Sequence, residues 1–181
     1  MRFSALVLSL TLLFTACSDS QTETSEIPVT TYELETASTK IYKLLKQGGN
    51  LKIEGHQGKV ILIDIFATWC PACKVISPHL SNLHQKYPKE LLVIGVLIEK
   101  NKEHDYVNTY AKKYDAQYPI SNCEANFNLA SRIAADLRQP RSFPIPLMVL
   151  YDTKGNYFRH YTGAVPEEII DRDIQSALGK K

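Results

Sequence analysis

The feature that most constrains the fold of this chain is a pair of cysteines that follows an apolar run. The run, Val60–Phe66, is rich in β-branched residues, which is typical of a central strand buried on both faces. Cys70 and Cys73 come shortly after it, and Pro71 lies between them at a position suited to the first turn of a helix. The sequence therefore predicts a strand that leads directly into a helix, with one thiol at the helix start.

Two cysteines with this spacing can close a small disulfide and open it again. The unpaired N–H groups and the dipole at a helix N-terminus favour a thiolate at Cys70. That thiolate can attack another disulfide, and Cys73 can then resolve the mixed disulfide. The same spacing also makes half of a zinc site, but the sequence contains no second Cys-x-x-Cys motif. We therefore interpret Cys70 as an exposed nucleophile of lowered pKa and Cys73 as a buried resolving cysteine, and we expect no metal.

The first sixteen residues are predicted to be a signal peptide. Arg2 supplies the positive end, and residues 3–14 form an apolar stretch too short to span a bilayer comfortably. The small residues before Cys17 resemble the bacterial lipoprotein processing site, where the cysteine becomes the lipidated first residue. An ordinary signal peptide cleaved near Ala16 is the alternative.

Residues 17–38 are interpreted as a lipidated cysteine and a flexible tether. Residues 18–38 contain five acids, no Lys or Arg, and few large apolar side chains, a composition typical of a flexible segment. One compact domain is then expected over residues 39–181. Removal of residues 1–16 takes away Arg2 and no acid, so the formal net charge falls from +2 to +1. This near-neutral charge gives no reason to expect nucleic acid as a partner.

The predicted elements alternate along the domain. Helices are expected over 39–47, 71–87, 103–114, 124–138 and 166–178, and strands over 51–53, 60–66, 91–98, 118–120, 147–151 and 157–161. The strand–helix–strand order of residues 60–98 predicts a right-handed βαβ unit with parallel strands.

Four separated segments resemble the thioredoxin-fold oxidoreductases. They are Asp64–Cys70, Cys73–Pro78, Ile145–Tyr151 and Gly163–Val165. The resemblance implies an α/β, thioredoxin-like fold in which a central mixed β-sheet is flanked by helices.

In three further features the chain resembles the TlpA/ResA-like proteins. These are membrane-tethered bacterial thiol:disulfide exchange proteins. These features are the long segment between Glu99 and Phe143, the Ala-Thr-Trp-Cys-Pro lead-in and the lipoprotein-like start. They imply an inserted helix–strand segment before the strand that carries the family's cis-proline.

Asp64 interrupts an apolar strand, so we expect a buried carboxyl with a raised pKa. The resemblance places it where thioredoxins have the group that takes the proton from the resolving cysteine, here Cys73. The alternative is an aspartate at a strand end that is bonded to backbone or water. The family's lysine on the neighbouring strand is replaced here by Gly95.

Pro146 matches the family's cis-proline, which faces the disulfide. A cis bond there would present the backbone of Ile145 to a substrate chain. The alternative is a rigid turn before a strand. Trp69 is expected to shield the disulfide and contact substrates, or else to pack in the core.

Three other side chains allow alternative chemistry. His79 and His84 lie on the helix after Cys73 and suggest a copper or zinc carrier, although surface or core histidines are the plainer interpretation. Cys123 is either a second redox partner for Cys70 or a buried spectator, because free cysteine often packs as a small apolar residue. An odd number of cysteines after Cys17 argues against a purely structural disulfide framework.

The resemblance implies a thiol:disulfide oxidoreductase without a cofactor. We expect a periplasmic, membrane-anchored lipoprotein that reduces protein disulfides, with apocytochrome c thiols or copper-site proteins as substrates and a membrane electron donor. A copper or zinc carrier and an oxidase that introduces disulfides are the alternatives.

Overall fold

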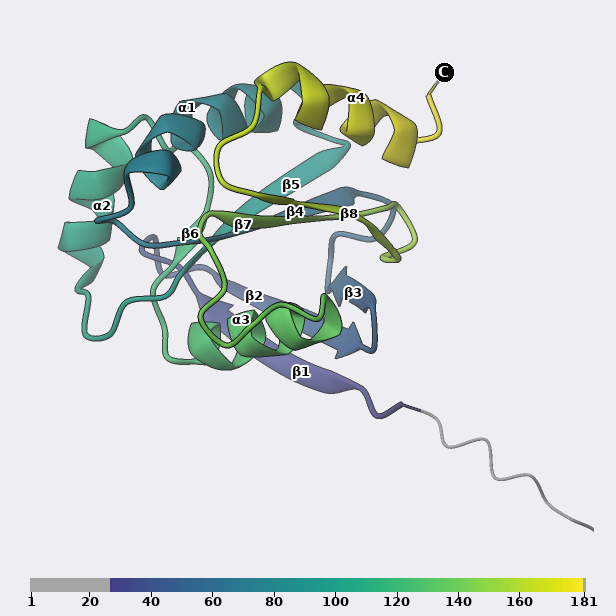
Figure 1. Cartoon of the computed structure of the whole chain (residues 1–181), viewed down its shortest axis with the longest axis horizontal. Coiled ribbons are helices and arrows are strands. Elements are labelled where there is room, and N and C mark those ends of the chain that lie inside the picture. Colours follow the sequence, from purple (N-terminus) through teal and green to yellow (C-terminus); the bar gives the residue numbers. More distant parts are fainter. Residues whose placement is uncertain (1–26, 181) are drawn as a thin grey trace, which may run out of the picture.

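The computed structural model describes residues 27–180 (Figure 1). The helices are α1 Pro71–Lys86, α2 His104–Lys113, α3 Ala125–Asp136 and α4 Glu167–Ala177. The strands are β1 Thr30–Glu35, β2 Ile41–Gln47, β3 Asn50–Ile53, β4 Val60–Phe66, β5 Leu91–Leu97, β6 Ile120–Ser121, β7 Leu147–Tyr151 and β8 Tyr157–Thr162.

The central sheet has five strands in the order β6-β5-β4-β7-β8. Strand β4 pairs in parallel with β5 and antiparallel with β7, so the sheet is mixed. Helices α1 and α4 lie over one face, and α3 lies over the other together with the separate β1-β2-β3 sheet (Figure 1). This is the predicted α/β architecture of a mixed sheet with helices on both sides. The predicted insertion is also present, as α2, β6 and α3 before β7.

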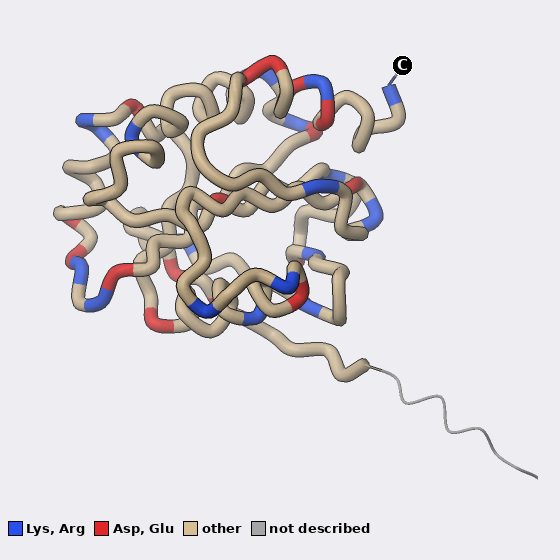
Figure 2. The backbone as a smooth tube through the Cα atoms, in the orientation of Figure 1, with Lys and Arg blue, Asp and Glu red and all other residues tan. Residues whose placement is uncertain are grey.

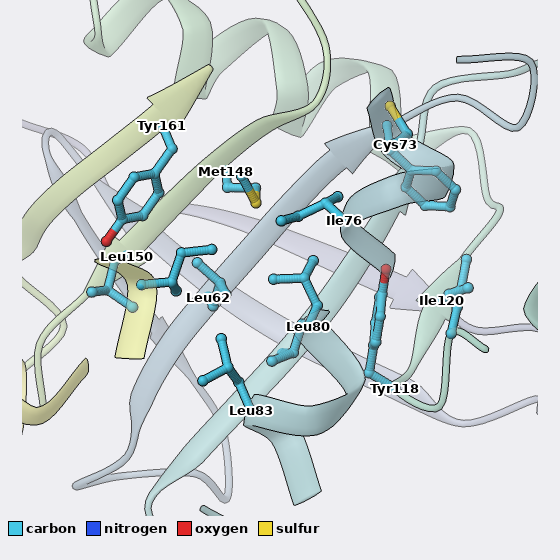
Figure 3. Packing of buried hydrophobic residues seen from close by; sticks show 14 of the residues in the cluster. Leu62, Cys73, Ile76, Leu80, Leu83, Tyr118, Ile120, Met148, Leu150 and Tyr161 are labelled. Carbon is cyan, nitrogen blue, oxygen red and sulfur yellow. The ribbon is translucent and has the colours of Figure 1, made fainter. Parts of the chain in front are cut away.

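The core has two layers, one on each face of the central sheet. Alternate residues of β4 point to opposite layers, so Leu62 and Phe66 join the layer under α1 and α4, while Ile63 and Ile65 join the layer against α3. Figure 3 shows Leu62 packed with Leu80 and Leu83 of α1 in the first layer. Every residue of β4 is buried, as expected for a strand covered on both faces.

The helix predicted over residues 39–47 is wrong, because this segment is strand β2. Its buried side chains alternate as Tyr42, Leu44 and Lys46, while Ile41 is 60 % exposed. The sequence prediction used the spacing of Ile41, Leu44 and Leu45, which fits a helix equally well over so short a stretch. The strand is favoured because it pairs with both β1 and β3.

The predicted boundary between tether and domain at residue 38 is also wrong. Strand β1 lies within the predicted tether and pairs with β2 along its whole length. The Ala37 N–H then donates to Ile120 O at 2.9 Å, which joins this segment to β6. The predicted signal peptide of residues 1–16 and the lipidated Cys17 lie outside the described residues.

The other predicted elements are confirmed, with ends shifted by one or two residues. Lys, Arg, Asp and Glu are interspersed along the described backbone (Figure 2). None of the helices within residues 27–180 is long and apolar enough to cross a membrane.

Candidate active site

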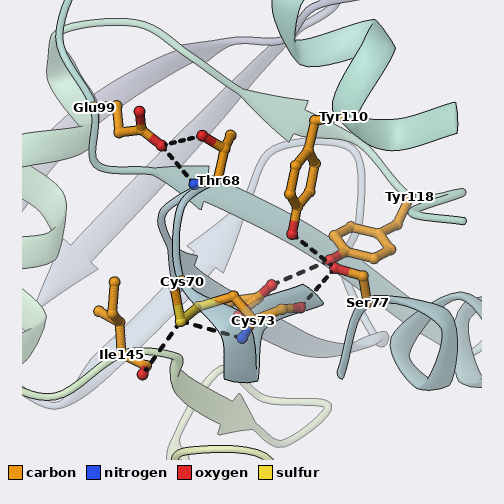
Figure 4. The surroundings of a disulfide bond; sticks show 9 residues. Thr68, Cys70, Cys73, Ser77, Glu99, Tyr110, Tyr118 and Ile145 are labelled. Atoms are coloured by element: carbon orange, nitrogen blue, oxygen red, sulfur yellow. Dashed lines mark hydrogen bonds between the residues drawn. A yellow bond between two sulfur atoms is a disulfide. The ribbon is translucent and has the colours of Figure 1, made fainter. Parts of the chain in front are cut away.

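Cys70 and Cys73 form a disulfide at the N-terminus of α1 (Figure 4). Cys70 is the N-cap residue with extended backbone angles, and Pro71 begins the helix as predicted. The backbone N–H of Cys73 donates to Sγ of Cys70 at 3.2 Å. After reduction, the same N–H and the helix dipole stabilise negative charge on the Cys70 sulfur.

Both sulfurs are covered in this oxidised state. Cys73 is 1 % exposed, which confirms the predicted burial, and Cys70 is only 3 % exposed, which contradicts the predicted exposure of that residue. The carbonyl oxygen of Ile145 lies 3.6 Å from Sγ of Cys70 and covers it. The resemblance placed the cis-proline loop opposite the disulfide, but the predicted exposure of Cys70 did not allow for the cover that the Ile145 carbonyl provides.

The Ile145–Pro146 peptide bond is cis, as predicted. Strand β7 begins one residue later at Leu147, which pairs with Ile65 near the end of β4. Because β4 and β7 are antiparallel neighbours, the end of one and the start of the other lie at the same sheet edge. This pairing brings Ile145 against Cys70 across 75 residues of sequence.

Asp64 lies in the core layer under α1, on the same face of β4 as Leu62 and Phe66. Only 1 % of its surface is exposed, and burial raises the pKa of its carboxyl to about 7. Both predictions for this residue, burial and a raised pKa, are confirmed. Its Oδ1 atom has no hydrogen-bond partner among the described residues.

Tyr118 takes the place of the cation that thioredoxins have near this carboxyl. Gly95 pairs directly with Asp64 on the adjacent strand, as the resemblance to thioredoxins implied. A Cβ atom at Gly95 would lie 3.1 Å from side-chain atoms of Phe66, Tyr118 and Ile120, so these side chains fill the space. The Tyr118 hydroxyl donates to Oδ2 of Asp64 at 3.1 Å, and burial raises the pKa of Tyr118 well above its usual range. Sequence reasoning missed this contact, which joins residues 54 positions apart.

A group of hydroxyls lies behind the disulfide. Figure 4 shows Ser77, Tyr110 and Tyr118 gathered next to Cys73. The Ser77 hydroxyl donates to the carbonyl oxygen of Cys73 at 2.9 Å and lies 3.2 Å from the hydroxyl of Tyr110. Burial raises the pKa of Tyr110 to about 12, so this hydroxyl stays protonated at neutral pH. The first turns of α1 are therefore fixed to α2 by polar contacts inside the core.

A second polar cluster fixes the loop before Cys70. One carboxylate oxygen of Glu99 accepts hydrogen bonds from the backbone N–H and the hydroxyl of Thr68, the latter at 2.6 Å. The Thr68 hydroxyl also lies 2.8 Å from that of Tyr106 on α2. Lys102 contacts the other carboxylate oxygen of Glu99 at 3.3 Å. Sequence reasoning did not identify Glu99 or Thr68, since nothing local marks two polar residues 31 positions apart as partners.

Trp69 stands at the surface beside the disulfide and is 66 % exposed. Core packing, one of its two predicted roles, is therefore wrong. The exposed ring offers an apolar surface next to Cys70.

The residues considered for metal binding or for a second redox reaction make other contacts. His79 contacts Glu167 of α4 at 2.9 Å, and the ring of His84 accepts a 3.3 Å hydrogen bond from Val93 N–H, with its pKa lowered by burial. Within residues 27–180 there is no group of three His, Cys, Asp or Glu side chains that could hold a metal ion. Cys123 is half-buried against the core layer on the α3 side, whereas Cys70 lies in the opposite layer.

Known proteins are similar to this chain in sequence. The thioredoxin family model matches residues 50–118. The thiol-disulfide oxidoreductase ResA of Halalkalibacterium halodurans is 22 % identical over 129 residues, which cover 71 % of this chain and 68 % of that protein.

Two solved structures have similar folds. One is a thiol:disulfide interchange protein of the thioredoxin family from Chlorobium tepidum, with a TM-score of 0.63, 21 % identity, and coverage of 85 % of this chain and 97 % of that one. The other is the pneumococcal exposed lipoprotein thioredoxin from Streptococcus pneumoniae, with a TM-score of 0.58, 14 % identity, and coverage of 81 % and 99 %.

The fold, the helix-tip disulfide and these relatives define the chain as a thioredoxin-fold thiol:disulfide oxidoreductase. Enzymes of this class exchange disulfides with protein thiols. Within the class, the chain is similar in sequence to the ResA enzymes.

Proposed function

We propose that the chain is an extracytoplasmic reductant of protein disulfides that acts through Cys70 and Cys73. The observation that carries the role of Cys70 as the nucleophile is the hydrogen bond from the Cys73 N–H to Sγ of Cys70 at the tip of α1. A sulfur held by a helix N-terminus and a backbone donor is stabilised as a thiolate, which is the attacking form of a thiol.

The reaction transfers two electrons from the dithiol to the substrate. The Cys70 thiolate attacks one sulfur of a substrate disulfide, which forms a mixed disulfide and releases the other substrate sulfur as a thiolate. Cys73 loses its proton and attacks Sγ of Cys70. The substrate leaves as a dithiol, and the protein is left with the Cys70–Cys73 disulfide seen in the structure.

Asp64 is the proton acceptor for Cys73 in this proposal. Its pKa of about 7 means that both protonation states are populated at neutral pH, so it can accept a proton and release it again. Asp64 and Cys73 border the same core layer, and the Tyr118 partner of Asp64 lies next to Cys73 in Figure 4.

Ile145 and Pro146 form the substrate clamp, together with Trp69. The Ile145 carbonyl oxygen faces Sγ of Cys70, so a substrate strand that pairs with this backbone would bring its cysteine to the same sulfur. The exposed ring of Trp69 adds apolar contact on the side next to Cys70. The resemblance of Ile145 to the residue before the cis-proline in thioredoxins favours the reducing direction.

The location outside the cytoplasm rests on the sequence. Residues 1–16 supply an export signal, Cys17 is the lipidated residue, and the segment before β1 links the anchor to the domain. The similarity to an exposed lipoprotein thioredoxin supports this location. Protein disulfides, including those of apocytochrome c or of copper-site proteins, are the proposed substrates, with a membrane electron donor to restore the dithiol.

The reduction potential of the Cys70–Cys73 pair tests the direction. Equilibration with glutathione or dithiothreitol buffers is expected to give a value close to thioredoxin, roughly −270 mV. A value near roughly −120 mV, as in strong oxidants, would replace the reductant proposal with the oxidase alternative.

A further inference from the structure

A groove opens beside the disulfide between α1 and α2. It encloses about 310 Å³, and its walls come from the loop before Cys70, the first turn of α1 and one side of α2. Besides two threonines, the lining side chains are aromatic or cationic: Trp69, Lys74, Tyr106, Tyr110, Lys113 and Tyr114. No acidic residue of the described chain lines it.

The spacing of the α2 residues places them on one side of that helix. Tyr106, Tyr110 and Lys113 follow one another at intervals of four and three residues, which puts them in a row along the helix. The groove is also lined by Trp69, the residue immediately before Cys70. A chain that lies in the groove therefore contacts the residue that directly precedes the nucleophilic cysteine.

The aromatic walls of the groove are open to solvent. Trp69 is 66 % exposed and Tyr106 is 44 % exposed, although large side chains of this kind usually bury most of their surface. Tyr106 is held in place by its hydroxyl contact with Thr68, so its ring offers a preformed surface. Rigid aromatic rings bind apolar side chains with little loss of conformational entropy.

The two lysines of the groove have no acidic partner within residues 27–180. Their ammonium groups lie over the ring of Tyr114, with Nζ of Lys74 5.3 Å and Nζ of Lys113 5.4 Å from its centroid. Positive charge thus lies beside Tyr114 in the groove, and no carboxylate of the described chain is within salt-bridge distance of either ammonium group. The complementary ligand carries negative charge next to an apolar or aromatic side chain.

We propose that this groove docks the segment of a substrate protein that flanks its reactive cysteine, and that it selects segments with acidic side chains beside an apolar one. The proposal rests on the proposed function, because the substrate cysteine must react with Cys70. The Ile145 backbone would bind the strand that contains the cysteine, while the groove would bind the residues to one side of it. Lys74 and Lys113 then set the charge preference, and Trp69 and Tyr106 provide the apolar contact.

The test uses two peptide disulfides and the reduced full-length chain. The peptides are identical except that two Glu in one are replaced by two Lys in the other, next to a Phe and a disulfide-linked cysteine. The rates of reduction are divided by the rate with hydroxyethyl disulfide, which is small and uncharged and so corrects for thiol reactivity. We expect the acidic peptide to react about fivefold faster at low salt, with the ratio falling as salt is added.

Adjacent lysines of α2 supply the matched control. Lys113 lines the groove, whereas Lys112 is exposed outside it. Lys113→Ala together with Lys74→Ala is expected to bring the ratio of rates close to one, and Lys113→Glu to favour the basic peptide. Lys112→Ala is expected to keep the preference for the acidic peptide.

Three outcomes overturn the groove proposal. They are equal rates for the two peptides, a preference for the basic peptide, and an equal loss of preference in Lys112→Ala and Lys113→Ala. These three outcomes apply when hydroxyethyl disulfide is reduced. The groove proposal then fails, while the proposed function stands. If hydroxyethyl disulfide is not reduced either, the proposed function fails and the groove proposal fails with it.

Discussion

The hydroxyl of Tyr118 lies 3.1 Å from Oδ2 of Asp64 and donates the hydrogen bond that this buried carboxyl receives. The two residues come from β4 and from the segment just before β6, and Gly95 between them leaves the space that the ring fills. A buried carboxyl with one neutral donor is easier to protonate than one beside a cation, because no positive charge offsets its desolvation. This arrangement sets the pKa of Asp64 at about 7.

The first prediction concerns catalysis by Asp64. The Asp64→Asn variant lacks the proton acceptor, so resolution of the mixed disulfide is expected to slow by about a hundredfold. In the parent protein this step should accelerate as pH rises through 7, because ionised Asp64 is the active form. Trp69 is the only tryptophan of the chain, and its stopped-flow fluorescence can follow the step without a label. A variant with the parent rate and pH profile would exclude this role.

The second prediction concerns stability and pH. Folding raises the pKa of Asp64 from 3.8 to about 7, so the unfolded chain ionises it first as pH rises. The contribution of Asp64 to the free energy of unfolding is therefore largest below about pH 4. It falls between about pH 4 and 7 and stays low above pH 7. The accumulated loss is on the order of 4 kcal/mol.

Urea unfolding of the oxidised protein at pH 5 and pH 8 measures the part of this loss that falls between pH 5 and 7, on the order of 3 kcal/mol. Asp64→Asn removes the titrating group, so the variant should lose less stability between the two pH values than the parent does. Equal losses in the parent and the variant would show that Asp64 titrates normally in the folded protein.

The third prediction isolates the hydroxyl of Tyr118. Tyr118→Phe keeps the ring over Gly95 but removes the donor that favours ionised Asp64. The midpoint of the pH profile is expected to rise by about one unit, since a hydrogen bond to a charged group contributes roughly 1.5 kcal/mol or more. Tyr110→Phe is the control, because its hydroxyl contacts Ser77 and not Asp64. An equal or larger shift in the control would mean that the contact between Ser77 and Tyr110, and not the hydrogen bond from Tyr118 to Asp64, sets the profile.

The fourth prediction concerns the loop before Cys70. Glu99→Ala leaves the Thr68 N–H without its acceptor, and the free energy of unfolding should fall by about 2 kcal/mol. Glu99→Gln keeps an oxygen acceptor at the same position, so its free energy of unfolding should fall by less. Chemical denaturation of both variants checks this order. Equal losses would indicate that the charge of Glu99, through Lys102, matters more than the hydrogen bonds to Thr68.

The sequence predicted those parts of the site that are close together along the chain. The apolar run before Cys70, the helix that begins at Pro71 and the buried Asp64 all follow from local patterns. Strand β2 was predicted as a helix, because a short apolar pattern fits both periods and only pairing with β1 and β3 decides between them. Strand β1 was predicted as tether, since its polar composition does not show the sheet it joins.

The polar contacts around the disulfide helix could not be predicted. Glu99, Tyr110 and Tyr118 reach the site from three different segments, and each is an ordinary residue in its own stretch of sequence. Cys70 was expected at the surface, and only the position of Ile145 explains why it is covered. These features depend on how distant segments pack, which local patterns do not record.

In the proposed reaction, Cys70 captures substrates and Cys73 releases them. The most direct measurement is mass spectrometry of the Cys73→Ser variant after incubation with a protein disulfide such as insulin. We expect a stable mixed disulfide that maps to Cys70, and no such adduct in the Cys70→Ser variant. An adduct that maps to Cys123, or equal disulfide exchange by both variants and the parent protein, would contradict it.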